Sequence, residues 1–253
     1  MDLGLRGKKA IVSGGTKGIG LAIAETLAAE GCDIAICARD GALVDATVAS
    51  LSGKGVQAYG ASADVTDGDG FRAWIGQAAG QLGGLDILVA NVSALAGAPD
   101  EEAWRAGLET DVLGTVRAVE AALPFLESSD CGSITAIAST AALENFFGVR
   151  AYNAIKAAVI AYMSALASTV AGTGVRANTV SPGTIFFEGG VWDVRRKETP
   201  AVYEAALAKN PTGHMGTPQD VANAVAFLAS PAAGFITGAN LVVDGALTQR
   251  VQF

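Results

Sequence analysis

The sequence of 253 residues has little of the chemistry that metal sites and disulfides need. It contains one histidine, His214, and three cysteines, Cys32, Cys37 and Cys131. A single histidine gives little support to a catalytic metal or to a Ser-His-Asp triad, so we expect no metal. The cysteines are odd in number and lack metal-ligand spacing, which argues against a disulfide framework. We expect buried free thiols in a cytoplasmic protein.

Charge is also scarce. Charged residues make up 17% of the chain and hydrophobic residues 51%, which excludes a disordered chain. The formal net charge of −8 repels phosphate backbones, so nucleic acid is not expected as a partner. A polar and basic segment, residues 1–9, leads directly into a short apolar run, without the long apolar region of a signal peptide.

Long hydrophobic runs are missing as well. Residues 157–175 carry no charge, but serine, threonine and glycine interrupt a stretch in which alanine dominates. A membrane-spanning helix needs about 20 residues of stronger hydropathy. We therefore expect a helix packed closely through small residues inside the protein, and no membrane partner.

What the chain does have is a regular alternation of short apolar runs and longer amphipathic segments. The pattern predicts strands at 10–13, 34–38, 57–62, 85–90, 132–138, 175–181 and 240–243. It predicts helices at 18–29, 42–51, 68–82, 101–126, 151–171 and 219–229, three of them ending at Gly31, Gly83 and Gly172. Repeated strand–helix units indicate an α/β fold: a doubly wound parallel sheet of Rossmann type with helices on both faces, in a single domain over 1–253.

One segment interrupts the alternation. Residues 184–211 combine aromatic side chains with a charged centre, between the last two predicted strands. Long insertions at this end of such a sheet are often substrate-binding lids. We interpret 184–211 as a lid, with an ordinary pair of surface helices as the alternative.

A glycine-rich turn follows the first predicted strand. It reads Gly14-Gly15-Thr16-Lys17-Gly18-Ile19-Gly20 and leads into a predicted helix. Glycines let the backbone approach a pyrophosphate, and the helix directs its free N–H groups and positive dipole at the phosphates. The spacing differs from the usual Gly-x-Gly-x-x-Gly, so the turn indicates a dinucleotide site only in combination with other motifs.

Three side chains form a candidate catalytic group. Tyr152 and Lys156 are four residues apart on a predicted helix, so a phenol and an ammonium point the same way. A nearby cation favours the ionised phenol, which makes Tyr152 a candidate general acid and base. Ser139 directly follows the predicted strand 132–138, where its hydroxyl could bind a substrate oxygen.

Together these motifs resemble the short-chain dehydrogenase/reductase family, in its single-domain form of about 250 residues, over essentially the whole chain. The resemblance implies hydride transfer between a nicotinamide cofactor and a carbonyl or alcohol carbon. Tyr152 would then exchange the proton, Ser139 would position the substrate oxygen, and Lys156 would hold the ribose and assist the tyrosine. Further cofactor contacts are implied for the glycine turn (Gly14, Thr16, Lys17, Gly18, Ile19, Gly20) and for Asp64, Val65, Asn91, Pro182, Gly183 and Ile185.

The chain also departs from the family pattern. Asp111 stands where the family usually has an asparagine whose backbone carbonyl serves a proton relay, so a carboxylate is expected near Lys156. Val92 makes the wall beside the nicotinamide ribose bulkier, and Phe187 replaces a threonine that often contacts the cofactor. Ala246 replaces the second glycine of a C-terminal signature.

The second predicted strand bears on the choice of cofactor. Relatives that use NAD commonly have an aspartate at its end, where Ala38 stands here, followed by Arg39. Lys17 approaches from the glycine turn, and Asp40 is expected to point away and cap the next helix. We therefore predict NADP(H) over NAD(H), with solvated Arg39 and Lys17 as the alternative.

The substrate is less defined by the sequence. Apolar candidates for the pocket are Val92, Leu95, Leu143, Phe146, Phe147, Phe186, Phe187 and Trp192, each of which could equally pack in the core or the lid. Arg150, Arg195 and Arg196 could meet an anion but are more simply read as solvated. We favour a small ketone or secondary alcohol, with a 3-oxoacyl thioester of an acyl carrier protein or coenzyme A second and a non-catalytic dinucleotide sensor third. Two long helices, 101–126 and 151–171, indicate a homo-oligomer, a tetramer by resemblance to the family.

Overall fold

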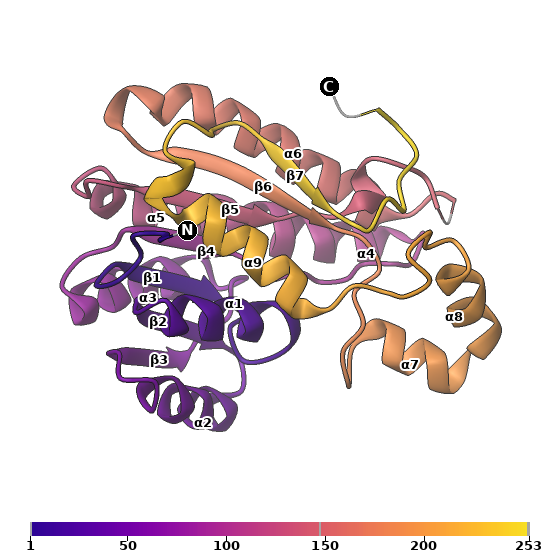
Figure 1. Ribbon diagram of the computed structural model, residues 1–253, viewed down its shortest axis with the longest axis horizontal. Helices are drawn as coiled ribbons and strands as arrows, with labels where there is room; N and C mark the ends of the chain where they lie inside the picture. Colours follow the sequence, from indigo (N-terminus) through magenta and orange to yellow (C-terminus); the bar gives the residue numbers. More distant parts are fainter. Residues whose placement is uncertain (1, 147, 252–253) are drawn as a thin grey trace.

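A computed structural model describes residues 2–146 and 148–251 (Figure 1). Seven parallel strands form one sheet in the order β3-β2-β1-β4-β5-β6-β7. Their bounds are β1 Lys9–Ser13, β2 Asp33–Ala38, β3 Ala58–Ser62, β4 Ile87–Ala90, β5 Ser133–Ile137, β6 Arg176–Pro182 and β7 Asn240–Val243. The strand order reverses between β1 and β4, and ligands of such sheets bind beside that point, at the carboxyl ends of the strands. The predicted fold class is confirmed.

Helices cover both faces of the sheet. One face packs against α1 (Gly18–Ala29), α2 (Gly41–Ser52) and α9 (Pro218–Ala229), and the other against α3 (Gly68–Leu82), α5 (Gly114–Leu126) and α6 (Ala151–Val170). Each face has its own apolar core, because the side chains of a strand alternate between the two sides. Strands β1, β4 and β5 are almost wholly buried, as central parallel strands must be.

Local signals set most helix ends. Asp40 accepts a hydrogen bond from the backbone N–H of Leu43 (3.1 Å) and caps α2, as the sequence predicts. Gly31 and Gly83 follow α1 and α3 with φ of 89° and 72°. The predicted stop at Gly172 is wrong. Helix α6 tightens into a 3-10 turn over Ala171–Thr173, and Gly174, with φ of 85°, makes the left-handed turn instead.

The single helix predicted over 101–126 is also wrong. The segment contains α4 (Glu101–Gly107), a π-helical turn over Leu108–Leu113, and then α5. The π-helical turn holds one extra residue, and Asp111 within it is buried. The Thr115 hydroxyl donates to the backbone carbonyl of Asp111 (2.6 Å) and so secures the turn.

The segment 184–211 folds into two short helices, α7 (Val191–Glu198) and α8 (Pro200–Leu207), beyond the carboxyl ends of the strands (Figure 1). Hydrogen bonds join the two ends of the segment to each other and to the chain that follows it. Phe186 donates its backbone N–H to Gly216 (2.8 Å), and the Thr184 hydroxyl donates to the Asn210 side chain (2.8 Å). The segment therefore stands as a closed loop over the end of the sheet where ligands bind.

Helix α6 is unusually apolar. With the 3-10 turn that follows, it is long and apolar enough to cross a membrane by length and composition alone, but only a third of that stretch is buried. Ile155, Val159 and Met163 on its inner face pack in the protein core. The expectation of a wholly internal helix therefore holds for one face only, and much of the apolar surface of α6 faces outward.

Candidate active site

Tyr152 and Lys156 lie in the first two turns of α6, and the Lys156 side chain reaches the end of β5. The Lys156 ammonium nitrogen is 5.8 Å from the centre of the Tyr152 ring, so the four-residue spacing does bring the two groups together. The backbone N–H of Tyr152 donates to the carbonyl of Ala96 (3.1 Å), which joins the start of α6 to the loop after β4.

Lys156 is buried, with 2% of its surface exposed, and two groups compensate its charge. Its Nζ donates to the carbonyl of Ile137 at the end of β5 (2.9 Å). The same nitrogen forms an ion pair with Asp111 Oδ1 (2.9 Å). The other carboxylate oxygen, Oδ2, accepts from the backbone N–H of Ala94 (2.9 Å). The sequence alone does not reveal the partners Ile137 and Ala94, because backbone groups leave no residue signature.

Ser139 is placed two residues beyond β5. It precedes a 3-10 turn over Thr140–Ala142, and its hydroxyl oxygen accepts from the backbone N–H of Ala141 (3.1 Å). That bond leaves the hydroxyl proton available, so Ser139 can donate to a substrate oxygen. Lys156 binds Ile137, two residues before Ser139, so one end of β5 positions both groups.

The glycine turn fits a dinucleotide. Gly14 and Gly18 have φ of 67° and 55°, which glycine adopts most readily. Lys17, in the N-cap position of α1, makes no side-chain capping bond, and no acidic residue lies in the first turn. By contrast, α2, α3, α4 and α9 begin with capping aspartate or threonine side chains. The N–H groups at the start of α1 are thus not occupied by a side-chain cap, as a phosphate site requires.

Asn91 braces the glycine turn. Its side-chain amide donates to the backbone carbonyls of Ser13 (3.1 Å) and Gly14 (3.3 Å). Its backbone N–H donates to the Ser13 hydroxyl (3.0 Å). These bonds join the ends of β1 and β4 at the strand-order reversal. Asn91, predicted by resemblance as a cofactor contact, therefore has a structural role in holding the glycine turn.

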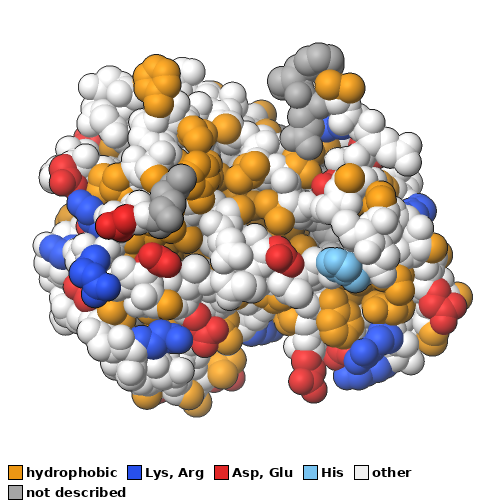
Figure 2. All heavy atoms as spheres, in the orientation of Figure 1, with side chains coloured by type: hydrophobic (Ala, Val, Ile, Leu, Met, Phe, Trp, Pro, Cys, Tyr) orange, Lys and Arg blue, Asp and Glu red, His pale blue; other side chains and the backbone are white. Residues whose placement is uncertain are grey.

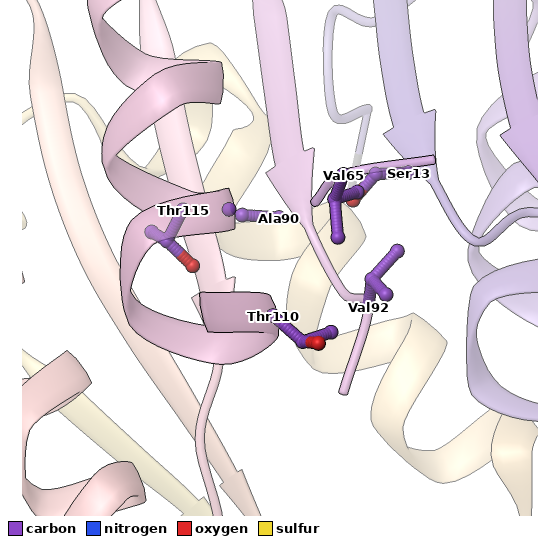
Figure 3. Close-up of a pocket in the computed structure, with 7 residues that line it drawn as sticks. Ser13, Val65, Ala90, Val92, Thr110 and Thr115 are labelled. Carbon is purple, nitrogen blue, oxygen red and sulfur yellow. The ribbon is translucent and has the colours of Figure 1, made fainter. Parts of the chain in front are cut away.

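A small cavity of about 10 Å³ lies behind this edge, close to the volume that one water occupies. Figure 3 shows Thr110 and Thr115 from the π-helical turn and α5 facing Ser13, Val65 and Val92 across it. Val65 is buried beside it. The neighbouring Asp64 carboxylate accepts from the backbone N–H and hydroxyl of Thr66, and these bonds lower the pKa of Asp64.

Pro182 is the last residue of β6 and pairs with Val243 at the end of β7, and Gly183 follows it. A Cβ on Gly183 would lie 2.7 Å from that of Asp244, so only glycine fits. Ile185 is buried and pairs with Gly216. The Phe187 ring packs over Gly18, since a Cβ there would lie 2.5 Å from the ring. The residue that replaces the family's threonine thus covers the glycine turn.

Ala246 adopts a φ of 66°, which is uncommon outside glycine. The family places a glycine at this position by resemblance, and the structure retains the left-handed backbone without it. Asp244 holds the turn by accepting from the backbone N–H of Ala246 (3.0 Å) and of Thr248 (2.9 Å).

Other predicted groups are more exposed. Arg39 and Lys17 are both exposed near the ends of β2 and β1, and the Arg39 charge contributes to lowering the pKa of Asp64. Ile19 is partly buried in α1, and Thr16 is buried in the turn. These positions are compatible with a cofactor that runs along the carboxyl edge of the sheet.

The expected pocket residues lie on several segments around this edge. Leu95 is 56% exposed and has a φ of 50°, a strained position for leucine. In the segment 184–211, Arg195 stacks on Trp192 (4.6 Å) and Arg196 on Phe186 (4.8 Å). Val92, Leu143 and Phe146 are partly buried, and Arg150 precedes α6. Phe147 lies outside the described residues.

Among the described residues, one group could supply metal ligands by proximity: Asp86, Asp130 and Cys131. It lies at the opposite edge of the sheet, where Lys8 already pairs with Asp130 (2.7 Å). It plays no part in the site at the carboxyl edge.

A helix N-terminus prepared for phosphates, and a serine, tyrosine and lysine around one strand end, define a dinucleotide-dependent oxidoreductase. A family model described as enoyl-(acyl carrier protein) reductase matches residues 14–248. The chain belongs to the short-chain dehydrogenase/reductase family.

Relatives extend this assignment over the full length. The chain is 34% identical to isoepoxydon dehydrogenase of Penicillium expansum, covering 100% of this chain and 99% of that one. A blue fluorescent protein from a metagenomic library, solved with NADPH, is 32% identical with a TM-score of 0.88 and covers 97% of this chain and 99% of its own. A 7α-hydroxysteroid dehydrogenase solved with NADH is 29% identical with a TM-score of 0.91, covering 99% and 98%. The protein transfers hydride between a nicotinamide cofactor and an alcohol or ketone.

Proposed function

We propose that the enzyme is an NADP(H)-dependent reductase of small, largely apolar ketones, working reversibly on the matching secondary alcohols. The observation that carries the proposal is the grouping of Ser139, Tyr152 and Lys156 at the end of β5, beside a glycine turn that fits a dinucleotide. The cofactor supplies the hydride when it is bound.

The side chains divide the remaining work. Ser139 donates a hydrogen bond to the carbonyl oxygen and orients it. Tyr152 donates its phenolic proton to the same oxygen as negative charge develops there, and takes a proton back in the alcohol direction. Lys156, fixed by Ile137 and Asp111, supplies the positive charge beside the phenol and holds the ribose. The closed loop that carries α7 and α8 excludes water when it acts as the substrate lid.

The test compares turnover of Tyr152→Phe with the wild type. Loss of the general acid lowers kcat by about 10²–10⁴-fold, while cofactor affinity stays near normal. Lys156→Met is expected to lower both kcat and the affinity for the cofactor. The matched control is Tyr162→Phe, the same change further along α6, where burial among core residues raises the pKa of the phenol. Half of the wild-type turnover in Tyr152→Phe would refute the assignment.

A substrate panel separates the alternatives. Cyclic and aryl ketones are expected to be reduced faster than 3-oxoacyl thioesters, because a chain with a net charge of −8 offers no basic surplus for an acidic carrier protein. The matching family model is described as enoyl-(acyl carrier protein) reductase, and relatives described as 3-oxoacyl-[acyl-carrier-protein] reductases are 32–34% identical, which keeps the thioester as the second candidate. Binding of NADPH with no turnover of any carbonyl would favour the dinucleotide sensor.

The preference for NADP(H) rests on Arg39 and Lys17. Both are exposed near the expected place of the adenosine ribose, and Ala38, the last residue of β2, stands where NAD-dependent relatives commonly have an aspartate. Two cations on a 2′-phosphate correspond to a preference of roughly 10²-fold in kcat/KM. The double variant Ala38→Asp/Arg39→Ala is expected to reverse it. A wild type that prefers NADH would overturn this part of the proposal.

We also propose a homotetramer in a reducing, cytoplasmic setting. The outward apolar face of α6 lies near α4 and the π-helical turn, where Trp104 and Leu108 are 39% and 49% exposed. A second apolar surface surrounds β7, with Phe235 fully exposed and Leu241 on the edge strand, and Figure 2 shows apolar side chains over β7. Two such surfaces suit two twofold contacts. Light scattering that gives a monomer at micromolar concentration would refute the tetramer.

A further inference from the structure

The buried pair Asp111–Lys156 is a charge arrangement that the general chemistry of the site does not require. Asp111 is 1% exposed and Lys156 2%, and Oδ1 lies 2.9 Å from Nζ. Within so buried a pair, the carboxylate cancels much of the field that the ammonium exerts on its surroundings. The Tyr152 ring, 5.8 Å from Nζ, is part of those surroundings.

Asp111 is held in place from three sides. Oδ2 accepts from the Ala94 N–H, Oδ1 faces Lys156, and the backbone carbonyl accepts from the Thr115 hydroxyl. The π-helical turn directs the side chain inward. If the carboxylate turned away, it would leave a buried ammonium without its counter-charge, which is strongly unfavourable.

We propose that Asp111 is a positioning residue that partly neutralises Lys156 and so weakens the field by which this ammonium favours the phenolate of Tyr152. The site is then set to donate a proton to a carbonyl near neutrality, and it oxidises alcohols efficiently only in more alkaline solution. In reduction the phenolic proton passes to the carbonyl oxygen as hydride reaches the carbon, and the phenolate recovers a proton from solvent. The inference rests on the proposed function.

Other charges near α6 are constant or engaged elsewhere. Arg150 precedes α6, two residues before Tyr152. Arg195 lies on α7, near enough for the charge of Arg150 to act on it. Neither changes in the variants below, so neither produces a difference between them. The other charged groups on segments packed around α6 have partners of their own or are exposed to solvent. Two glutamates form ion pairs, Glu101 with Arg105 and Glu109 with Arg117. Glu144 accepts from the N–H groups of Gln249 and Arg250, Arg176 donates to carbonyls at the end of α9, and Glu102 is exposed.

The first test is the pH profile of alcohol oxidation in Asp111→Asn. Removing the negative charge favours the phenolate, so the rise of kcat with pH is expected to move to lower pH by about one unit. The control is Asp86→Asn, a partly buried aspartate that accepts from the Lys9 N–H at the opposite edge of the sheet. Its profile is expected to coincide with that of the wild type. An Asp111→Asn profile that also coincides would overturn the proposal.

The second test needs neither cofactor nor turnover. Tyrosinate absorbance is titrated in the apo-protein, with and without Tyr152→Phe, and the difference isolates the ionisation of Tyr152. It is expected at lower pH in Asp111→Asn than in the wild type, and no shift would overturn the proposal. Asp111→Ser serves if the asparagine variant does not fold, because its hydroxyl can accept from Ala94 without placing an amide donor against Lys156. A wild type without carbonyl reduction would refute the proposed function, while this titration still reports on Asp111.

Discussion

Replacing Gly20 by alanine tests how the glycine turn is built. Gly20 is buried in the first turn of α1, and a Cβ there would overlap the carbonyl oxygen of Gly14 and lie 2.5 Å from Asn91 Nδ2. Neither neighbour can yield freely, because the same amide nitrogen donates to that carbonyl (3.3 Å) in the brace between β1 and β4. The new methyl group must therefore push the turn open.

The expected loss follows from three contributions. Alanine in place of glycine in a helix stabilises by up to about 1 kcal/mol. The overlap costs about 3 kcal/mol, at the upper end for added methyl groups in packed sites. The lost hydrogen bond of Asn91 costs about 1 kcal/mol more. The net loss of about 3 kcal/mol corresponds to a fall in Tm of roughly 6–12 °C for a chain of this length.

Thermal unfolding of the apo-protein provides the measurement, with two matched glycines as controls. Gly18→Ala is expected to cost only about 1 kcal/mol, from its φ of 55°, because the group it meets is the Phe187 side chain, which can turn away. Gly80→Ala, on the open surface of α3, is expected to stabilise by about 0.5–1 kcal/mol. A Gly20→Ala protein with the Tm of the Gly80→Ala control would show that the turn is not braced as described.

Three further outcomes are expected. Arg176→Met is expected to lower the free energy of unfolding in urea by about 3 kcal/mol, because the buried guanidinium donates to carbonyls at the end of α9; equal stability would contradict this. Lys197 and a backbone N–H lower the pKa of Asp193 to about 2, so the stability that the Asp193 carboxylate gives α7 is present above pH 4 and is lost between about pH 4 and 2. Proteolysis of α7 is therefore expected to rise over that range in the wild type. The same rise in Asp193→Asn would contradict the role assigned to this carboxylate. Burial raises the pKa of Cys32 and Cys37 to about 12, so alkylation of the native protein at pH 8 is expected to modify half-buried Cys131 first, and early labelling of the other two would contradict the packing.

The sequence predicted the elements of the sheet to within about two residues, because buried parallel strands and amphipathic helices differ in length and periodicity. The helix cap at Asp40 was equally legible, since its carboxylate acts on a residue three positions away. The same holds for Tyr152 and Lys156, which one turn of helix brings together. Features that depend on residues close together in the sequence can therefore be predicted from the sequence.

The remaining features depend on contacts between distant segments. The π-helical turn cannot be read from periodicity, because one extra residue scarcely changes the pattern of apolar positions between 101 and 126. The pairing of Asp111 with Lys156 joins α6 to that turn, and the brace made by Asn91 joins two strands through backbone carbonyls. Resemblance already predicted the Asp111 carboxylate near Lys156, while the backbone partners of Asp111 and Asn91 are shown only by the fold.

The π-helical turn also has a consequence for the helical phase of the segment 101–126. A single inserted residue accounts for the wide turn, so removing one residue from Leu108–Leu113 would let α4 and α5 join as one continuous α-helix with their packed faces still aligned. The packed faces of α4 and α5 would keep their alignment, while the inward-facing carboxylate of Asp111 would lose its place beside Lys156. The packing of α4 and α5 against the sheet and the placement of Asp111 thus depend on different features of the same segment. An insertion or deletion in the π-helical turn can alter the chemistry of the site while leaving the sheet and its covering helices unchanged.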